Sequence, residues 1–304
     1  EINGKIINAE INFNHNGLVR SICLDSRSIK SGDVFVAILG EELDGHQFVD
    51  DAIKNGAIAS IISDKKQFNE NKSPFFLVED TYEALRDISD YLTQQNNALR
   101  IAITGSVGKT TTKNYLHSIL KNYGKTVSSP QSFNNYLGVI LSRSKVHKDT
   151  DYAIFEVGMN RQDEISKLSH LIRPNIAIIT NIGEAHIGNL GSRENIAIEK
   201  TKIIDGMDKE GLVILPRDSE FYDLLVNSVK QKKLSHITFG KNIKADINII
   251  KIERTANISK VYLNIHGERY TFETVLQNLN LIENYLPILG VASHYNFNLD
   301  DFFY

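Results

Sequence analysis

The stretch LRIAITGSVGKTTTKNYLHSIL, residues 99–120, decides the fold of most of this chain. An apolar run ends at Thr104, two glycines surround Ser106 and Val107, and a helical pattern follows Lys109. Glycines let successive N–H groups turn toward one phosphate, and the N-terminus of a helix adds partial positive charge. We therefore predict a phosphate-binding loop formed by Gly105, Ser106, Val107, Gly108, Lys109, Thr110 and Thr111.

The loop departs from the common G-x-x-x-x-G-K-[ST] pattern, because position 103 is isoleucine where that pattern has its first glycine. Lys109 is expected to reach the β- and γ-phosphates of a nucleotide, and the Thr110 hydroxyl to ligate Mg²⁺. The alternative reading is a tight turn between a strand and a helix with an exposed lysine. The strand–loop–helix context favours phosphate binding.

Downstream of the loop, apolar strand-like runs alternate with helical stretches. The expected strands are 100–104, 152–157, 175–180 and 212–215, and the expected helices are 109–122, 162–172, 192–207 and 219–230. Strands that are apolar on both faces belong in the middle of a parallel sheet, and ligands bind outside the carboxyl ends of such strands. Shorter strands at 246–250, 261–265 and 270–272 and a helical run at 279–292 follow. We predict an α/β P-loop domain with a mainly parallel sheet over residues 98–304.

Residues 1–97 read as a separate, small, mixed α/β domain that ends in the polar segment 93–97. Strands are expected at 34–38, 58–63 and 75–78, and helices at 47–55 and 81–91. Thr81 is expected to be the N-cap of the second helix.

The composition is that of an ordinary globular protein, with 41% hydrophobic and 23% charged residues in a chain of 304. The formal net charge of −3 provides no bulk positive charge for binding nucleic acid. The single cysteine, Cys23, excludes a disulfide framework and a multi-cysteine metal site. Apolar runs are far shorter than the roughly 20 residues that span a bilayer, and the first residues lack the pattern of a signal peptide. We expect a cytoplasmic protein without membrane insertion.

Three ionisable residues follow or flank the expected parallel strands. Glu156 ends an apolar strand, where a carboxylate is costly unless it is paired or binds a metal; a strand-end glutamate that faces solvent is the alternative. His186 lies in a loop after the next strand, where a surface histidine is the usual reading. Lys200 shares a helical stripe with Ile196 and Ile203, which predicts a lysine on a buried face. Its stem could snorkel to solvent, or it could have a functional partner or a modification that removes its charge.

Several stretches together resemble the Mur ligase family. They are TGSVGKTT (104–111), SFNNYLGV (132–139), FEVGMN (155–160), TNIGEAHIGNLGSRENIA (180–197) and the helix that contains Lys200. Residues 24–57 resemble the N-terminal domain with which some family members bind a UDP-sugar. The resemblance covers nearly the whole chain. Within the family it is strongest to the ligases that add D-alanyl-D-alanine to UDP-MurNAc-tripeptide.

The resemblance implies an ATP-dependent amide ligase of peptidoglycan precursor synthesis that uses Mg²⁺. ATP would phosphorylate the terminal carboxylate of UDP-MurNAc-tripeptide, and the amine of D-Ala-D-Ala would attack the acyl phosphate. By resemblance, Lys109 holds the phosphates, while Thr110 and Glu156 ligate one Mg²⁺. His186 and a carbamylated Lys200 would support a second metal ion. We expect a monomer without a nucleic-acid partner.

The resemblance also assigns contacts to the substrates and to adenine. Asn134 and Asn135 match the family's asparagine pair near the substrate and the γ-phosphate, and Asn284 matches its adenine contact. The expected contacts to the UDP-sugar are Asp25, Ser26, Arg27, Gly45 and His46.

The sequence differs from the family pattern at three places. The family's H-N-x-x-N before the last central helix aligns with 280–284, where only the second asparagine, Asn284, is kept. Members often read N-H-x-G-E-I where this chain has NRQDEI at 160–165. A third, Rossmann-like domain follows in the family where this sequence stops, so we expect a two-domain fragment that ligates poorly by itself.

Three alternative functions remain open. They are a ligase that adds the third amino acid to UDP-MurNAc-dipeptide, a non-catalytic nucleotide-sugar-binding protein, and a P-loop kinase. The segments NNYLGV and NIGEAHIGNLGS favour the D-Ala-D-Ala-adding ligase over the first. The extra N-terminal domain and the missing first glycine argue against a kinase.

Overall fold

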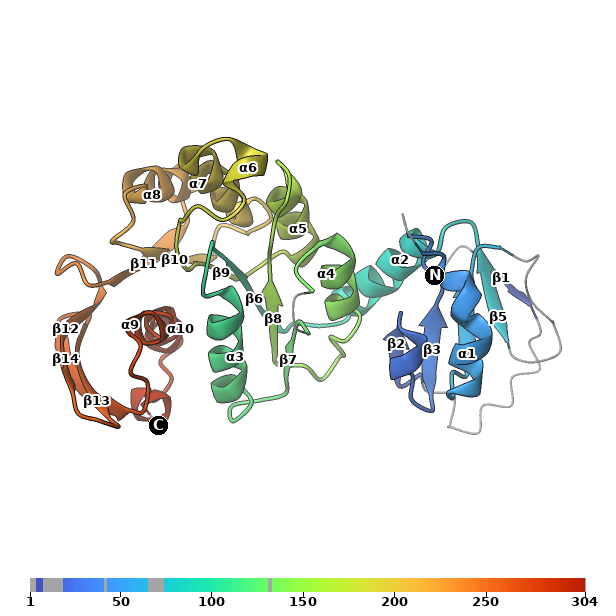
Figure 1. The fold of residues 1–304 in the computed structure, drawn as a ribbon, viewed down its shortest axis with the longest axis horizontal. Helices are drawn as coiled ribbons and strands as arrows, with labels where there is room; N and C mark the ends of the chain where they lie inside the picture. The colour runs from blue at the N-terminus through green and yellow to red at the C-terminus, as the bar shows by residue number, and fades with distance from the viewer. Residues whose placement is uncertain (1–3, 8–18, 41–42, 65–73, 131–132, 304) are drawn as a thin grey trace. The chain divides into compact units, whose positions relative to one another are not determined.

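The computed structural model describes residues 4–7, 19–40, 43–64, 74–130 and 133–303. The start of the chain and positions 41–42 and 132 of the stretches quoted above therefore lie outside the described residues. The chain forms two compact units, which we describe separately (Figure 1). The N-terminal unit comprises Glu1–Asn97 with Arg143–Lys148, and the central unit comprises Ala98–Ser142 with Asp149–Tyr304.

The N-terminal unit is built on a five-stranded sheet in the order β1-β5-β4-β3-β2. Its strands are β1 (Gly4–Ile7), β2 (Ser21–Cys23), β3 (Asp33–Val36), β4 (Ala59–Ile62) and β5 (Phe75–Val78), and its helices are η1 (Ser26–Ser28), η2 (Gly45–Phe48), α1 (Val49–Lys54) and α2 (Thr81–Gln94). Only β1 pairs antiparallel among these described strands. Phe35, Val49, Ala52 and Phe75 form the centre of a buried apolar cluster between the sheet and α1.

Helix α2 begins differently from the prediction, because its N-cap is Asp80 and not Thr81. The Asp80 carboxylate accepts hydrogen bonds from the N–H groups of Tyr82 and Glu83 at 2.6 and 3.1 Å. The Thr81 hydroxyl instead donates to the carbonyl oxygen of Ala37 at 2.8 Å, which ties α2 to the end of β3.

The central unit contains a nine-stranded sheet in the order β14-β13-β12-β11-β10-β9-β6-β8-β7. Its strands are β6 (Leu99–Thr104), β7 (Thr126–Ser128), β8 (Tyr152–Glu156), β9 (Ile176–Ile179), β10 (Leu212–Pro216), β11 (Ser235–Gly240), β12 (Ile247–Arg254), β13 (Ser259–Ile265) and β14 (Glu268–Thr274). Pairing is parallel from β7 to β12, and antiparallel from β12 to β14. The predicted mainly parallel sheet is confirmed.

Helices cover both faces of this sheet (Figure 1). The helices of this unit are α3 (Lys109–Leu120), α4 (Tyr136–Arg143), α5 (Glu164–Ile172), α6 (Ile187–Leu190), α7 (Arg193–Thr201), η3 (Lys202–Ile204), α8 (Tyr222–Gln231), α9 (Leu279–Glu283), α10 (Leu286–His294) and η4 (Leu299–Phe302). Helices α5, α7 and α8 lie over one face, and α3 and α10 over the other. Apolar side chains of α3, α9 and α10 pack with those of the strands in one continuous core.

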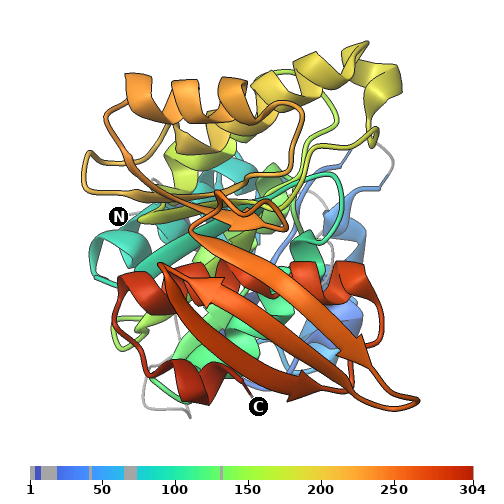
Figure 2. The ribbon, with the colours of Figure 1, turned by 90° about the vertical axis from the view of Figure 1, so that its left-hand side faces the viewer.

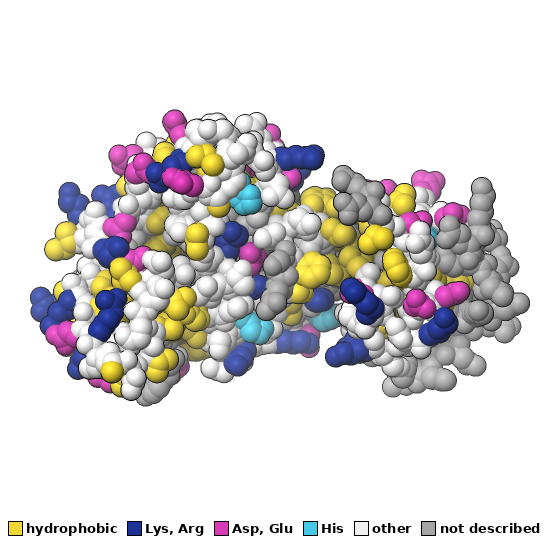
Figure 3. Space-filling view, in the orientation of Figure 1, with side chains coloured by type: hydrophobic (Ala, Val, Ile, Leu, Met, Phe, Trp, Pro, Cys, Tyr) yellow, Lys and Arg dark blue, Asp and Glu magenta, His cyan; other side chains and the backbone are white. Residues whose placement is uncertain are grey.

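The last third of the unit differs from the prediction in two ways. The helical run expected at 279–292 is two helices, because the helix is interrupted at Asn284 and Tyr285 before α10 begins at Leu286. The strands β12–β14 are longer than expected and curve over α10 (Figure 2). Their outer face is solvated, and charged side chains gather over it at the left of Figure 3. Within the described ranges, no helix has the length and apolar character needed to cross a membrane.

Candidate functional site

The glycine-rich loop joins β6 to α3 in backbone conformations that favour glycine. Gly105 has φ +151° and Gly108 has φ +88°. A Cβ on Gly105 would lie 1.9 Å from the Thr180 hydroxyl oxygen, and one on Gly108 would lie 2.2 Å from Oδ1 of Asn284. The loop therefore has both the left-handed backbone and the close packing that only glycine permits at these positions.

Lys109 lies at the first turn of α3 and folds back over the loop. Its Nζ donates to the carbonyl oxygen of Gly105 at 2.8 Å. Burial lowers the pKa of Lys109, and the negative charge of Glu156 acts in the opposite direction. An ammonium held over a ring of backbone amides can neutralise a bound phosphate.

The segment after β9 holds the loop from the side. The N–H of Val107 donates to Oδ1 of Asn181 at 2.8 Å, and the N–H of Gly183 donates to Oγ of Ser106 at 2.8 Å. The Thr180 hydroxyl donates to the carbonyl oxygen of Val107 at 2.6 Å. Sequence reasoning did not assign Thr180 or Asn181, although both belong to a stretch that it quoted.

Glu156 is the centre of a buried polar cluster at the end of β8. Its Oε2 accepts a hydrogen bond from the Thr110 hydroxyl at 2.8 Å and lies 3.5 Å from Nζ of Lys113. Its Oε1 accepts from Nδ2 of Asn134 at 3.3 Å, and its backbone N–H donates to Oγ of Ser129. The prediction of a paired, buried carboxylate is confirmed, and the solvent-facing alternative is wrong because Glu156 is 2% exposed.

This cluster has the donor chemistry that Mg²⁺ prefers. A carboxylate and a hydroxyl lie together beside the phosphate loop, and hard oxygen ligands of this kind suit Mg²⁺. Because Asn134 carries both an oxygen and a nitrogen on its amide, either atom can face the cluster. Lys113, which sequence reasoning missed, supplies a positive charge that partly compensates Glu156.

Lys200 and His186 lie where their charges act on the phosphate loop. Lys200 is 2% exposed, and burial together with the nearby charge of Lys109 lowers its pKa to about 7. His186 is exposed at the start of α6 with φ +71°. Partial burial and the charges of Lys200 and Lys109 lower the pKa of His186, against a smaller effect of Glu164.

Lys200 Nζ has no hydrogen-bond or ion-pair partner among the residues that the structure describes. Its neighbour Glu199, which is equally buried, is fully engaged by the N–H of Ile165 and by Nζ of Lys202. The described residues also contain no group of three or more His, Cys, Asp or Glu side chains arranged to hold a metal. The predicted buried face of Lys200 is confirmed, and its role in metal binding stays a prediction.

Two predicted asparagines have different surroundings. Asn284 packs against Gly108, and its carbonyl oxygen accepts from the Thr112 hydroxyl at 3.2 Å, so it lies directly beside the phosphate loop. Asn135 accepts the N–H of Gly138 at 2.9 Å, close to the start of α4. Thr111 lies in the first turn of α3.

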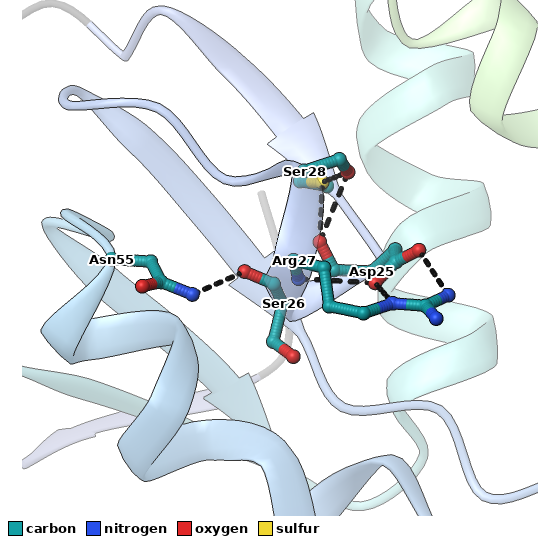
Figure 4. Close-up of polar contacts among 6 residues, drawn as sticks. Asp25, Ser26, Arg27, Ser28 and Asn55 are labelled. Carbon is teal, nitrogen blue, oxygen red and sulfur yellow. Dashed lines mark hydrogen bonds and ion pairs between the residues drawn. The ribbon is translucent and has the colours of Figure 1, made fainter.

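Three of the predicted sugar-nucleotide residues, Asp25, Ser26 and Arg27, lie on a compact polar turn around η1 (Figure 4). The Arg27 guanidinium donates twice to the Asp25 carboxylate, at 2.9 and 2.8 Å. The hydrogen bonds to Arg27 lower the pKa of Asp25. Asn55 donates to the carbonyl oxygen of Ser26 at 2.9 Å, and the hydroxyl of Ser26 points away from the other labelled side chains.

Gly45 and His46 face the interior of the same unit. The His46 ring is 4% exposed, its Nδ1 lies 2.6 Å from Oδ1 of Asp44, and its Nε2 accepts the N–H of Ser63 at 2.9 Å. A Cβ on Gly45 would lie 2.7 Å from the carbonyl oxygen of Ile38. The structure therefore places both residues where they shape the backbone, with the His46 ring turned away from solvent.

The parallel sheet and the loop after its β6 strand are those of a P-loop protein. A family model for the Mur ligase middle domain matches residues 103–292, and one for the Mur ligase family, catalytic domain, matches residues 18–93. The chain belongs to the Mur ligase family, as the sequence resemblance predicted.

Individual relatives agree with this assignment. The chain is 39% identical over 227 residues to the UDP-N-acetylmuramoyl-tripeptide–D-alanyl-D-alanine ligase of Rickettsia prowazekii. This alignment covers 74% of this chain and 50% of the relative. The ligase of the same name from Buchnera aphidicola subsp. Baizongia pistaciae is 33% identical over 286 residues, covering 94% of this chain and 62% of the relative.

Solved structures are similar over the same range. MurF from Acinetobacter baumannii superposes with a TM-score of 0.82 at 30% identity, covering 94% of this chain and 62% of that one. MurF ligase from Thermotoga maritima, solved in complex with ADP, superposes with a TM-score of 0.78 at 26% identity, covering 94% and 66%. The chain thus spans between half and two thirds of the length of these relatives.

Proposed function

We propose that this chain is the substrate- and ATP-binding part of a ligase that joins D-Ala-D-Ala to UDP-MurNAc-tripeptide. The observation that carries the proposal is the contact of Thr110 with the buried carboxylate of Glu156, directly beside the loop closed by Lys109. The names of the relatives and the complex of one of them with ADP support the same reaction.

The phosphates of ATP would lie over the amides of residues 105–111, in the place where Lys109 now bonds to Gly105. A bound phosphate would replace the Gly105 carbonyl as the partner of the Lys109 ammonium. The phosphate would also lie at the positive N-terminal end of α3. Asn284, packed against Gly108, would stand beside the nucleotide on the other side of the loop. Gly105, Ser106 and Val107 are held in shape by the segment after β9, so the loop needs little reordering when the nucleotide binds.

Thr110, Glu156 and the amide of Asn134 would hold Mg²⁺, which when bound neutralises the charge of the phosphates and of the transferring group. Lys113 keeps the Glu156 carboxylate in position behind this site. A buried Lys200 with a pKa of about 7 has a substantial neutral fraction at physiological pH, which is the form that can react with CO₂ to give a carbamate. Carbamylation would replace an unpartnered cation by an anion that, with His186, could hold a second cation.

The polar turn of the N-terminal unit would bind the UDP-sugar. The Arg27 guanidinium is largely exposed and offers a donor to a diphosphate beyond its bonds to Asp25, while Ser26 on the same turn is buried. Gly45 and His46 would support this surface from behind through the His46 contact to Ser63. The protein would act in the cytoplasm, as a monomer, with D-Ala-D-Ala as its second substrate.

Calorimetric titration with ADP and Mg²⁺ tests the nucleotide site. Wild type should bind ADP, and Lys109→Ala should weaken binding about tenfold or more, because a charged hydrogen bond contributes roughly 1.5–3 kcal/mol. Lys121→Ala removes a positive charge from the end of α3, remote from the loop, and serves as the matched control. Equal ADP affinity of the Lys109 and Lys121 variants would contradict the proposed role of the loop.

A further inference from the structure

A polar pocket of about 790 Å³ lies in the central unit, beside the site already described. It is lined by Asn160, Arg161, Gln162 and Asn189. The first three follow β8, the strand that carries Glu156, and the fourth belongs to α6, which begins after His186. Because β8 and β9 are parallel to β6 on either side of it, the pocket lies at the sheet edge where the phosphate loop also lies.

The backbone around the pocket is fixed at both ends. The N–H of Asn160 donates to Oε2 of Glu164 at 2.6 Å, which closes the turn before α5. Asp163, with φ +64°, forms an ion pair of 2.6 Å with Lys202. On the other wall, Nδ2 of Asn195 donates to the carbonyl oxygen of Leu190 at 2.7 Å and holds α6. The turn therefore presents the side chains of residues 160–162 outward on a braced backbone.

The lining has one cation and three neutral amides. In the described part of the chain, the guanidinium of Arg161 has no hydrogen-bond or ion-pair partner, unlike Arg143 and Arg193, which pair with Asp90 and Glu220. None of the described residues that line this pocket is a carboxylate. A planar guanidinium without a partner, beside amides that donate and accept, is complementary to a carboxylate on a polar ligand such as a peptide.

We propose that Arg161 is a specificity-determining residue that binds a carboxylate of a peptide substrate, with Asn160, Gln162 and Asn189 hydrogen-bonding to the same molecule. This inference rests on the proposed function, which supplies two sources of that carboxylate, UDP-MurNAc-tripeptide and D-Ala-D-Ala. The phosphates of a nucleotide are weaker candidates for the ligand of Arg161, because the loop at residues 105–111 already provides backbone amides and Lys109 to bind them.

The test is calorimetric titration of wild type, Arg161→Ala and Arg161→Lys with UDP-MurNAc-tripeptide, UDP-MurNAc and D-Ala-D-Ala. Arg161→Ala should weaken binding of one peptide ligand about tenfold or more, and should leave UDP-MurNAc and ADP unchanged. Arg161→Lys should recover only part of the loss, because an ammonium cannot form the two parallel bonds of a guanidinium. The peptide ligand whose affinity falls identifies the source of the carboxylate.

Lys167→Ala is the matched control, since it removes one positive charge from an exposed position of α5 that does not line the pocket. Its affinities should equal those of wild type, which separates a specific contact from a change in net charge. The proposed function requires that wild type binds UDP-MurNAc-tripeptide more tightly than UDP-MurNAc. If it does, and Arg161→Ala binds UDP-MurNAc-tripeptide, UDP-MurNAc and D-Ala-D-Ala with wild-type affinities, the proposed role of Arg161 is wrong and the proposed function stands. If wild type binds neither UDP-sugar ligand, the proposed function fails and this inference fails with it.

Discussion

Replacing Glu156 with glutamine removes the negative charge at the centre of the cluster formed with Thr110, Lys113 and Asn134. Lys113 and Glu156 are both almost completely buried, and Nζ lies 3.5 Å from Oε2. Leaving one partner of a buried ion pair uncompensated costs about 3–5 kcal/mol. In a unit of this size each kcal/mol lowers the Tm by about 2–4 °C, so we expect Glu156→Gln to melt roughly 6–20 °C below wild type.

Differential scanning calorimetry of three proteins measures this effect. They are wild type, Glu156→Gln, and the double variant Glu156→Gln/Lys113→Met, in which neither charge remains. The double variant should recover much of the lost Tm, because removing both buried charges avoids leaving a lysine uncompensated. ADP titrations with and without Mg²⁺ on the same proteins should show that both variants lose most of the Mg²⁺ dependence that wild type has.

Two results would refute this reasoning. A Tm of Glu156→Gln within about 2 °C of wild type would mean that the pair with Lys113 contributes little to stability. An undiminished effect of Mg²⁺ on ADP affinity in Glu156→Gln would remove Glu156 from the proposed metal site, whatever its effect on stability.

Three further predictions follow from single residues. The pKa of Lys200 is about 7 in the folded chain, against 10.5 for an ordinary lysine. The unfolded chain therefore binds more protons between these two pH values, and wild-type stability rises with pH across them. Lys200→Met lacks this dependence. In CO₂-free buffer the Tm of Lys200→Met should exceed that of wild type at pH 7, by the equivalent of at most about 4 kcal/mol, and the excess should shrink by pH 9. A Tm difference that stays constant between pH 7 and pH 9 would contradict the depressed pKa of Lys200. Gly108→Ala should weaken ADP binding about tenfold or more, because the new Cβ would meet Asn284. Gly108→Ala/Asn284→Ala should recover only part of the lost ADP affinity, since the left-handed backbone at position 108 still costs about 1–2 kcal/mol. Full recovery of the ADP affinity would show that this backbone conformation does not limit binding. Asp80→Ala should lower the stability of the N-terminal unit by about 1 kcal/mol in urea unfolding, while Thr81→Ser, which keeps its hydroxyl, should change it less.

Periodicity predicted those features that depend on local sequence. The stripe that Lys200 shares with Ile196 and Ile203 correctly indicated a buried lysine. The same reasoning could have found Lys113, because it precedes the buried Leu116 and Leu120 by three and seven residues on α3. The N-cap of α2 was placed one residue late, since aspartate and threonine stand side by side there and only the structure shows which one accepts the N–H groups.

Features that depend on distant partners could not be predicted. The buried His46 ring accepts the N–H of Ser63, which lies 17 positions away just after β4, and no local pattern indicates that contact. The support of the phosphate loop by Asn181 joins residues 74 positions apart, and it exists because β6 and β9 are neighbours in the sheet. The order of the strands in the sheet could not be predicted either. The amino-acid pattern indicated parallel strands but not which strands are neighbours.

The most direct test of the proposed function is titration of this chain with UDP-MurNAc-tripeptide, UDP-MurNAc-dipeptide and UDP-MurNAc. The tripeptide form should bind most tightly, because a D-Ala-D-Ala-adding ligase must recognise the third residue before it activates the terminal carboxylate. Tighter binding of the dipeptide form would contradict the account and would favour a ligase that adds the third amino acid.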